Sequence, residues 1–523
     1  MKNYQGPRDF FKKQKLRIAV LTTFVVLGIA LRCLHIDNIY AHDEVYTSFR
    51  INGYLSGQVA KEIEGNTLSA QQIKHFQSND GTTWQNAFNA FATRPEHPPL
   101  FFVLERFWTS IFGDSIIALR SLPVVFGIVS IPIVYWFCLE LFGVSRMALV
   151  AVALMAVSPF HVFYSQYARA YSLWILLTLC SSIATVRFLK KDSKLNFSFL
   201  LLTTILSLYT HILSGTVLLA QCIYAAWYEK FKATKKLKLF LSQAFVGGIV
   251  LLGWFIICSI VHSENLVDSI KTVENVMGGF TMNRLRIFQF LGLHFSGLFI
   301  KLTRIVGFPY EIYLLVLILV LGIIFCSYLI FLKTQPLEKV LLILLIFGVS
   351  AIPIVLSDLL DSGIASRNAR YFCPAILMTS IVVAYSINFA QKSQTEWFQV
   401  TGDVILSAFL FFGVVSCFSR DDVNFSHVPH VTKYLNSQES PIVYAGKIVN
   451  LIAVADKSES DTSFVFLRDS IEDIDSNEFL LEGRYIFEPN PKMEKYFEDN
   501  KELKLSPVLG NRAYLFRVEK QDI

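Results

Sequence analysis

Two adjacent carboxylates stand out in a chain that is otherwise strongly apolar. Asp43 and Glu44 lie in the stretch NIYAHDEVYT, residues 38 to 47, within ten residues of the end of a hydrophobic run. One such group can act as a general base that accepts the proton of a substrate hydroxyl. The other can position a substrate or bind a metal ion. The alternative is a solvated loop start, because carboxylates are common at helix ends.

Arginines and histidines recur in other short polar segments. Arg169, Arg367 and Arg370 have planar guanidinium groups, which suit a phosphate or pyrophosphate. Their alternative is snorkelling at a membrane interface. Three histidines are either hydrogen-bonded interfacial residues or metal ligands, and their spacing does not decide between the two: His97, His161 and His211.

The composition indicates which elements must position these residues. Of 523 residues, 53% are hydrophobic and 17% are charged, whereas charged residues make up about a quarter of a typical globular domain. Eleven apolar runs each approach the roughly 20 residues that cross a bilayer. The sequence therefore predicts an all-α polytopic membrane protein with about eleven transmembrane helices. These runs are 18–34, 116–141, 147–163, 171–188, 195–210, 212–228, 239–258, 308–332, 340–356, 371–390 and 401–417.

The distribution of basic residues predicts the topology. With the N-terminus in the cytoplasm, the six short cytoplasmic segments contain 19 Lys and Arg in 51 residues, against 47 in 523 overall. This excess is the positive-inside pattern, so the net charge of +6 does not indicate a nucleic-acid partner. We expect an integral plasma (inner) membrane protein with residues 418–523 outside the cytoplasm.

The C-terminal segment differs in composition from the rest of the chain. Four short apolar bursts, PIVYAG, SFVFLRD, RYIFEP and AYLFRVE, predict strands of a small soluble α/β domain over residues 418–523. Residues 1–417 would form the transmembrane catalytic domain, with one long outer loop at 35–115. Two apolar segments with internal charges, 97–113 and 285–304, are interpreted as interfacial or partly embedded helices rather than spans.

This topology places six polar segments on the outer face. A site formed by several helix ends at the bilayer surface suits a substrate with a lipid tail and a polar head. The segments are DE at 43–44, the loop end with Arg94, Glu96 and His97, YSQYAR at 164–169, YTH at 209–211, SENLVDSIKTVEN after the seventh run, and SRNARY at 366–371.

The order of these motifs resembles a known family. DE after the first run, HPPLFFVLERFWTSIFGDSIIALRSLPVVFGIVSIPIVYW, SPFHVFYSQYARAYSL, LYTH and RYFCPA together resemble the bacterial branch of the dolichyl-phosphate-mannose protein mannosyltransferases, in the GT-C superfamily of membrane glycosyltransferases. The resemblance implies a GT-C type fold and a polyprenyl-phosphate-linked sugar donor. It also implies a mannosyltransferase-like hexosyl or pentosyl transfer, with inversion, on the outer face.

The resemblance also implies roles for individual residues. Asp43 would be the base, with Glu44 beside it, and Arg169 and Arg370, with Tyr371, would bind the donor phosphate. Membrane lipids and a glycan, lipid or protein acceptor would be the other partners. Further substrate contacts would come from Glu96, His97, Gln166 and His211.

One position departs from the family pattern. Relatives usually have YSQEAR where this chain has YSQYAR, so Tyr167 replaces an acid. A metal site is therefore unknown, and a divalent cation is an open alternative. A transporter or lipid flippase is the rival from another class, although transport pathways usually place ionisable residues near the midplane and the runs here contain almost none. A glycolipid or cell-wall glycan is an equally open acceptor.

Overall fold

The chain divides into two compact units. The computed structural model describes residues 7–261, 284–301, 310–361, 363–418, 427–459, 461–467, 484–499, 503–509 and 514–520. The first unit comprises Met1–Ile36, Ala92–Phe101 and Arg120–Arg420. The second comprises Asp37–Phe91, Phe102–Leu119 and Asp421–Ile523. The SENLVDSIKTVEN segment lies outside the described residues.

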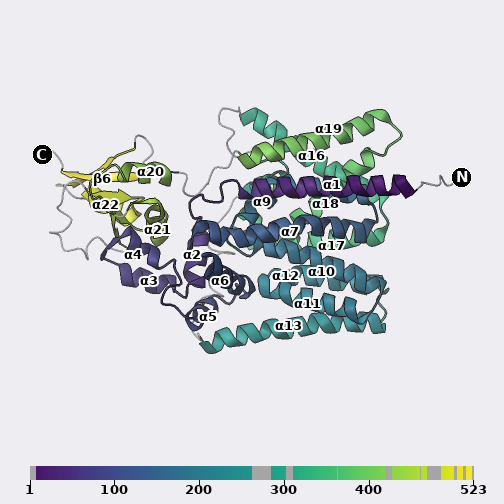
Figure 1. The fold of residues 1–523 in the computed structure, drawn as a ribbon, viewed down its shortest axis with the longest axis horizontal. Helices are drawn as coiled ribbons and strands as arrows, with labels where there is room; N and C mark the ends of the chain where they lie inside the picture. Colours follow the sequence, from purple (N-terminus) through teal and green to yellow (C-terminus); the bar gives the residue numbers. More distant parts are fainter. Residues whose placement is uncertain are drawn as a thin grey trace. The chain divides into compact units, whose positions relative to one another are not determined.

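The first unit is a bundle of helices, which run alongside one another in Figure 1. Its long elements follow the apolar runs of the sequence, because a helix satisfies all of its own backbone hydrogen bonds in lipid. They are α1 (Pro7–Cys33), α7 (Ile116–Phe142, from Arg120 in this unit), α8 (Ser145–Val157), α9 (Pro159–Ser165), α10 (Tyr171–Lys190), α11 (Lys194–Thr210), α12 (Ser214–Tyr228), α13 (Lys235–Val261), α15 (Arg284–Ser296), α16 (Tyr310–Thr334), α17 (Leu337–Asp361), the short turns η1 (Ala365–Arg367) and η2 (Ala369–Phe372), α18 (Cys373–Ala390) and α19 (Glu396–Phe418).

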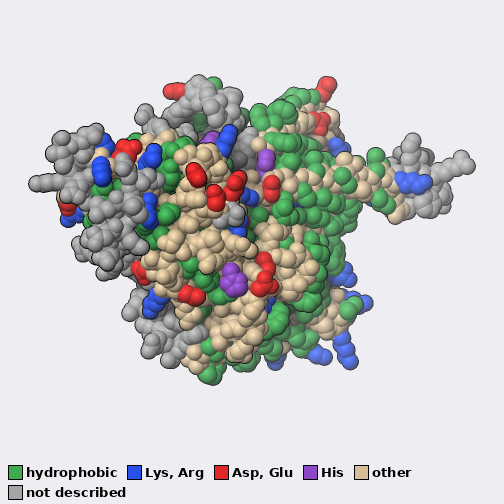
Figure 2. Space-filling view, turned by 60° about the vertical axis from the view of Figure 1, so that its left-hand side comes forward, with side chains coloured by type: hydrophobic (Ala, Val, Ile, Leu, Met, Phe, Trp, Pro, Cys, Tyr) green, Lys and Arg blue, Asp and Glu red, His purple; other side chains and the backbone are tan. Residues whose placement is uncertain are grey.

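Helix α18 is the centre of this bundle. All of its residues except Phe389 are buried, and it contacts α8, α10, α16, α17 and α19. Helices such as α13 and α16 lie at the periphery and expose large apolar side chains, among them Phe245, Ile260 and Leu315. Figure 2 shows hydrophobic side chains over the outside of the bundle, with Lys and Arg gathered at its right-hand edge. This surface fits a lipid environment.

The predicted fold class is confirmed, and each of the eleven apolar runs forms helix where it is described. Among the described residues, eight helices are long and apolar enough to cross a membrane, or nine if one bent pair counts as a span. Helices α11 and α12 have only 17 and 15 residues. The bent pair is α8 and α9, which meet at 58°. Ser158 starts α9 by accepting a hydrogen bond from the backbone N–H of His161, so the run predicted at 147–163 is not one straight helix.

The second unit combines most of the long loop predicted at 35–115 with the C-terminal segment. Its core is a six-stranded sheet in the order β1-β3-β2-β4-β6-β5. Strand β2 pairs in parallel with β3 and β4, and the outer pairs are antiparallel. The elements of this unit are α2 (His42–Ile51), α3 (Ser56–Ile63), β1 (Thr67–Ser69), α4 (Ala70–His75), α5 (Trp84–Ala92), α6 (Leu100–Phe112), α20 (Val428–Leu435), β2 (Ile442–Ala445), α21 (Ile448–Lys457), β3 (Ser463–Phe466), β4 (Tyr485–Phe487), α22 (Pro491–Asp499), β5 (Leu503–Pro507) and β6 (Leu515–Lys520).

The four apolar bursts of the C-terminal segment form β2, β3, β4 and β6, as predicted. The sequence analysis did not include β5 or β1. Strand β1 belongs to the first outer loop and pairs with β3 through the register Leu68 to Phe464. Side chains of Tyr444, Val465, Ile486 and other residues form an apolar cluster in this unit. The first loop and the C-terminal segment therefore fold together.

The two apolar segments that carry charges are short helices. Helices α6 and α15 each have 13 residues, fewer than the roughly 20 that a span needs. Their length fits the prediction that neither crosses the membrane.

Candidate active site

The acidic pair begins a helix of the second unit, and its two members have different environments. Asp43 is partly exposed, whereas Glu44 is fully buried. The Glu44 carboxylate accepts a hydrogen bond from the backbone N–H of Ala41 at 2.8 Å and so caps the start of α2. Both acids lie in the first turn, where the helix dipole favours negative charge. Glu44 therefore fixes the turn, and Asp43 presents a carboxylate at its surface.

The C-terminal segment holds α2 in place. Helix α21 contacts α2 and α4, and the Lys457 ammonium group at its end donates to the carbonyl oxygen of Asp37 at 3.3 Å. Lys457 and Asp37 lie more than 400 positions apart in the chain. The C-terminal segment thus helps to position the helix that begins with the acidic pair.

A third carboxyl group lies near this pair. Glu105 in α6 is fully buried, and neither of its oxygens has a hydrogen-bond partner among the described residues. Burial raises the pKa of Glu105 well above its usual value, and the charge of Glu44 raises it further. The protonated form of Glu105 is therefore favoured relative to an exposed glutamate. In the sequence, Glu105 is one of the internal charges of the apolar segment 97–113.

Helix α6 is fixed against α2 by residues on both sides of Glu105. The Arg50 guanidinium lies 4.7 Å from the centre of the Phe102 ring. Arg106 donates to the carbonyl oxygen of Ile51 and, at 3.1 Å, to that of Thr82. Phe102, Glu105 and Arg106 share one helical face through their i, i+3 and i+4 spacing. That face is turned toward α2.

In the first unit, two of the predicted phosphate-binding arginines come together at a histidine. Burial, together with the charges of Arg169 and Arg370, lowers the pKa of His211 to about 3. Arg169 directly precedes α10, and Arg370 lies in η2. His211 lies in the turn between α11 and α12. The Arg370 guanidinium lies 5.4 Å from the centre of the Tyr371 ring. The structure thus gathers positive charge at one helix-end cluster, next to a neutral histidine.

A buried acid and a histidine position the segment that contains Arg370. The Asp358 carboxylate, at the end of α17, accepts hydrogen bonds from the backbone N–H groups of Ala365 at 3.2 Å and Ser366 at 2.5 Å. The His294 ring bonds the Ser366 carbonyl oxygen at 2.9 Å. Asp358 is 1% exposed. The sequence analysis missed this acid because it lies just past the end of an apolar run.

A buried arginine and an amide position the segment that contains Arg169. Gln166 donates to the backbone carbonyl oxygens at the end of α1, including that of Arg32 at 2.8 Å. Arg32 is fully buried. It donates to Ser165 at 3.2 Å and to the last carbonyl groups of α8, at Ala156 and Met155. The amide group of Gln166, which was predicted as a substrate contact, thus binds the segment before α10 to the end of α1.

The loop that contains Glu96 and His97 is tied to α13. The Trp254 indole N–H donates to the Pro95 carbonyl oxygen at 3.2 Å, and Arg94 lies 3.9 Å from the Glu96 carboxylate. One carboxylate oxygen of Glu96 is buried without a hydrogen-bond partner among the described residues. The segment is thus a structured turn of the first unit, and its two site candidates stay predictions.

Comparisons with known proteins concern the fold of the chain. Residues 96–257 match the family profile described as "Dolichyl-phosphate-mannose-protein mannosyltransferase". The structure of ArnT from Cupriavidus metallidurans bound to undecaprenyl phosphate is 12% identical, with a TM-score of 0.56, over 95% of this chain and 97% of that chain. The protein has a GT-C membrane glycosyltransferase fold. The apo form of ArnT matches over the same shares, with 10% identity and a TM-score of 0.56. No curated protein matches the chain in sequence.

Aromatic packing occupies the position where the sequence has Tyr167 in place of the acid of the resembled family. Tyr167 is 8% exposed. Its ring stacks on Phe163, with 5.7 Å between the centroids, and also contacts Tyr164 and Tyr171. Across the described parts of the chain, no three or more His, Cys, Asp or Glu side chains gather where they could hold a metal ion.

Proposed function

We propose that the protein transfers a monosaccharide from a polyprenyl-phosphate donor to an acceptor hydroxyl on the outer face of the inner membrane. The observation that supports this most is the cluster of Arg169, Arg370 and His211 in the first unit. Two guanidinium groups from separate elements suit a phosphate whose charge increases as the sugar leaves. The long apolar helices around it suit a donor whose tail stays in lipid.

The reaction would be a single displacement with inversion. The acceptor oxygen forms a bond to the anomeric carbon as the bond between that carbon and the phosphate oxygen breaks. The acceptor proton goes to Asp43, and polyprenyl phosphate leaves as a dianion. Because the transition state resembles an oxocarbenium ion, fixed cations that stabilise the leaving phosphate are the main contribution we expect from Arg169 and Arg370.

The two acids would have separate functions. Asp43 is partly exposed and can meet an acceptor, so we assign it as the base. Glu44 is buried and caps α2, so we assign it to positioning Asp43. His211, predicted as a substrate contact, would donate a neutral N–H to the donor without adding charge.

Donor binding tests the arginine cluster. We expect undecaprenyl phosphate, used as the probe with the full chain in lipid nanodiscs, to bind about 10-fold or more weakly to Arg370→Gln, because a hydrogen bond to a charged group contributes roughly 1.5–3 kcal/mol. Arg370→Lys should recover part of this loss, since it keeps the charge without the fork of donors. Arg146→Gln, outside the cluster, is the matched control. If all variants bound undecaprenyl phosphate with equal affinity, the assignment of the arginines to the donor site would be wrong.

Turnover tests the function itself. Purified protein supplied with polyprenyl-phosphate sugars and a cell-envelope extract should release free polyprenyl phosphate and form a product with the opposite anomeric configuration. Asp43→Asn should lower that release by at least about 100-fold, within the range of general-base effects. Asp80→Asn, an exposed acid of the same loop, should keep full activity. Full turnover by Asp43→Asn would refute the base assignment, and no turnover with any such donor would refute the function.

A further inference from the structure

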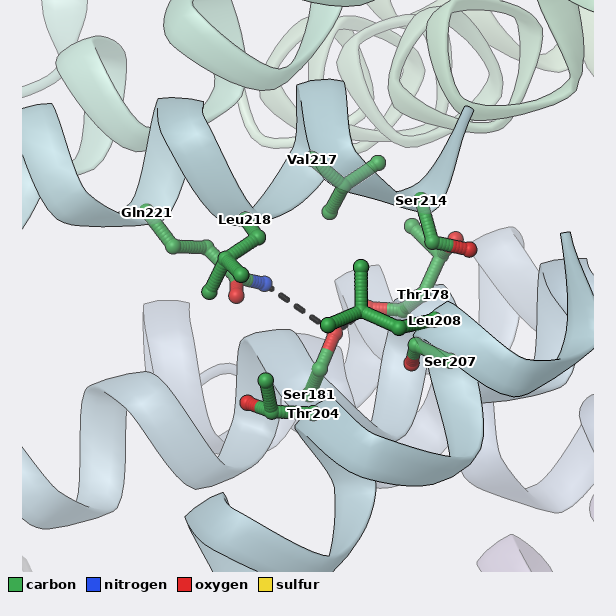
Figure 3. Close-up of a pocket in the computed structure, with 9 residues that line it drawn as sticks. All are labelled: Thr178, Ser181, Thr204, Ser207, Leu208, Ser214, Val217, Leu218 and Gln221. Carbon is green, nitrogen blue, oxygen red and sulfur yellow. Dashed lines mark hydrogen bonds between the residues drawn. The ribbon is translucent and has the colours of Figure 1, made fainter. Parts of the chain in front are cut away.

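A small cavity lies among three helices of the first unit. It has a volume of about 10 Å³ and is bounded by α10, α11 and α12, as Figure 3 shows. Five of its nine lining residues carry a hydroxyl group, and none of the nine carries a charge. These residues are Thr178, Ser181, Thr204, Ser207, Leu208, Ser214, Val217, Leu218 and Gln221.

Three of the hydroxyl groups in this lining have no hydrogen-bond partner. Thr204, Ser207 and Ser214 are 2%, 8% and 2% exposed, and their side-chain oxygens bond to nothing within the described residues. The far wall is different, because the Gln221 amide donates to the Ser181 hydroxyl at 3.0 Å. Buried polar groups without partners are costly, and lipid supplies none. Three of them around one cavity therefore indicate that something is bound there.

The size and chemistry of the cavity limit what it can hold. Its volume is close to the minimum that one water needs, which is about 10–15 Å³ by this measure. A sugar or a lipid chain is far larger. A buried water usually makes two to four hydrogen bonds, and three unpartnered hydroxyls meet that number. A cation would prefer carboxylate or several carbonyl ligands.

We propose that this cavity binds one ordered water molecule, which bridges Thr204 and Ser207 of α11 to Ser214 of α12. Ser207 and Ser214 flank the turn that contains His211. The backbone N–H of His211 donates to the Ser207 carbonyl oxygen at 3.2 Å, and that of Ser214 donates to the His211 carbonyl oxygen at 2.9 Å. The water therefore closes the α11–α12 hairpin on its inner side and fixes the backbone at His211. This inference does not depend on the proposed catalytic activity.

Substitutions that remove single hydroxyl groups test the proposal, because a bound water and an empty cavity predict opposite changes in thermal stability. Thr204→Val keeps the side-chain shape, and Ser214→Ala removes a single oxygen. If a water is bound, each substitution loses a hydrogen bond, and the midpoint of thermal unfolding of the full chain in detergent should fall by a few degrees. If the cavity is dry, each substitution removes an unsatisfied group and the midpoint should rise. An unchanged or higher midpoint would overturn the proposal.

A matched control and a second measurement keep this test decisive. Ser242→Ala removes an exposed hydroxyl from α13 and should leave the midpoint unchanged. In the unmodified protein, radiolysis in ¹⁸O-labelled water should label Leu208 and Leu218, because hydroxyl radicals form from the water beside them. Absence of the label would refute a bound water. A midpoint that falls when sodium is replaced by choline would show a cation instead.

Discussion

The imidazole ring of His211 stacks on the indole ring of Trp174, with 4.2 Å between the centroids and 4° between the planes. Trp174 is itself buried in α10. The contact fixes the orientation of the histidine beside Arg169 and Arg370. It also removes the ring from solvent, which is why the pKa of His211 falls to about 3.

We expect His211 to make stability depend on pH. Because the folded pKa is depressed, the unfolded chain binds a proton between about pH 6.5 and 3 while the folded chain does not. Unfolding free energy should therefore fall as pH falls through this window, by about 1.4 kcal/mol per pH unit from this group alone. His211→Gln should reduce that slope in thermal unfolding, whereas His42→Gln, an exposed histidine, should change it less. The same slope in His211→Gln and wild type would contradict the argument.

Asp358 should control donor binding without touching the donor. Asp358→Asn places an amide N–H₂ where the carboxylate accepts two backbone N–H groups, so one of those bonds is lost, at a cost of about 1–3 kcal/mol. The segment with Arg370 should loosen, and undecaprenyl phosphate should bind more weakly while Arg370 is still present. Asp403→Asn, an exposed acid, is the control. If Asp358→Asn lowers stability but leaves affinity intact, Asp358 is structural only.

Glu105 should make stability depend on pH in the direction opposite to His211. Its folded pKa is raised, so the folded chain keeps a proton that the unfolded chain has lost above about pH 4.5. Stability should fall as pH rises above that value, by about 1.4 kcal/mol per pH unit until the folded group ionises. Glu105→Gln, neutral and nearly isosteric, should abolish this loss and be more stable than wild type at neutral pH. Glu105→Ala should be less stable at every pH, since it leaves a cavity.

The Glu105 experiment is thermal unfolding of the full chain across a range of pH. The two variants separate ionisation from packing, because only one of them preserves the side-chain volume. Parallel stability curves for Glu105→Gln and wild type would show that Glu105 is already ionised in the folded protein.

Gly127 should be intolerant of a methyl group. It lies in α7, where an added Cβ would overlap the Ser165 hydroxyl and come within 3.1 Å of the Arg32 guanidinium. Gly127→Ala should therefore displace the contacts that hold the break between α8 and α9, at a cost of about 1–3 kcal/mol. Gly322→Ala, in α16 with open space around it, should be neutral or slightly stabilising. Thermal unfolding of the two variants compares them directly, and equal midpoints would contradict the expected clash.

The positions of most elements could be predicted because their signals are local. An apolar run of about 20 residues must form a helix in lipid, since no other span satisfies its own backbone there. The bursts around Val443, Val465, Ile486 and Phe516 similarly marked their strands. Strand β1 had no such signal, because its three residues are too few to show an alternation of apolar and polar side chains. Its partner β3 lies about 400 positions away in the chain.

The residues that surround the candidate site depended on tertiary contacts. Arg169, Arg370 and His211 were predicted on one face from topology, and the structure brings them together in the first unit. Asp358, Arg32 and Trp174 could not be assigned from sequence, because a buried polar group is identified by its hydrogen-bond partners, and those lie on other helices. Glu105 was visible as a charged residue type, but its raised pKa follows only from burial beside Glu44.

The sequence by itself determined that this is a helical membrane protein with an acidic pair after the first apolar run, and its motif order carried the resemblance to the GT-C superfamily, because hydropathy, charge excess and motif order are properties of the chain. Only the tertiary structure decided that Glu44 is buried while Asp43 is partly exposed, that the C-terminal segment folds with the first loop, and that three hydroxyls surround one small cavity. Burial and hydrogen-bond satisfaction depend on residues distant in sequence, and a linear pattern does not contain them.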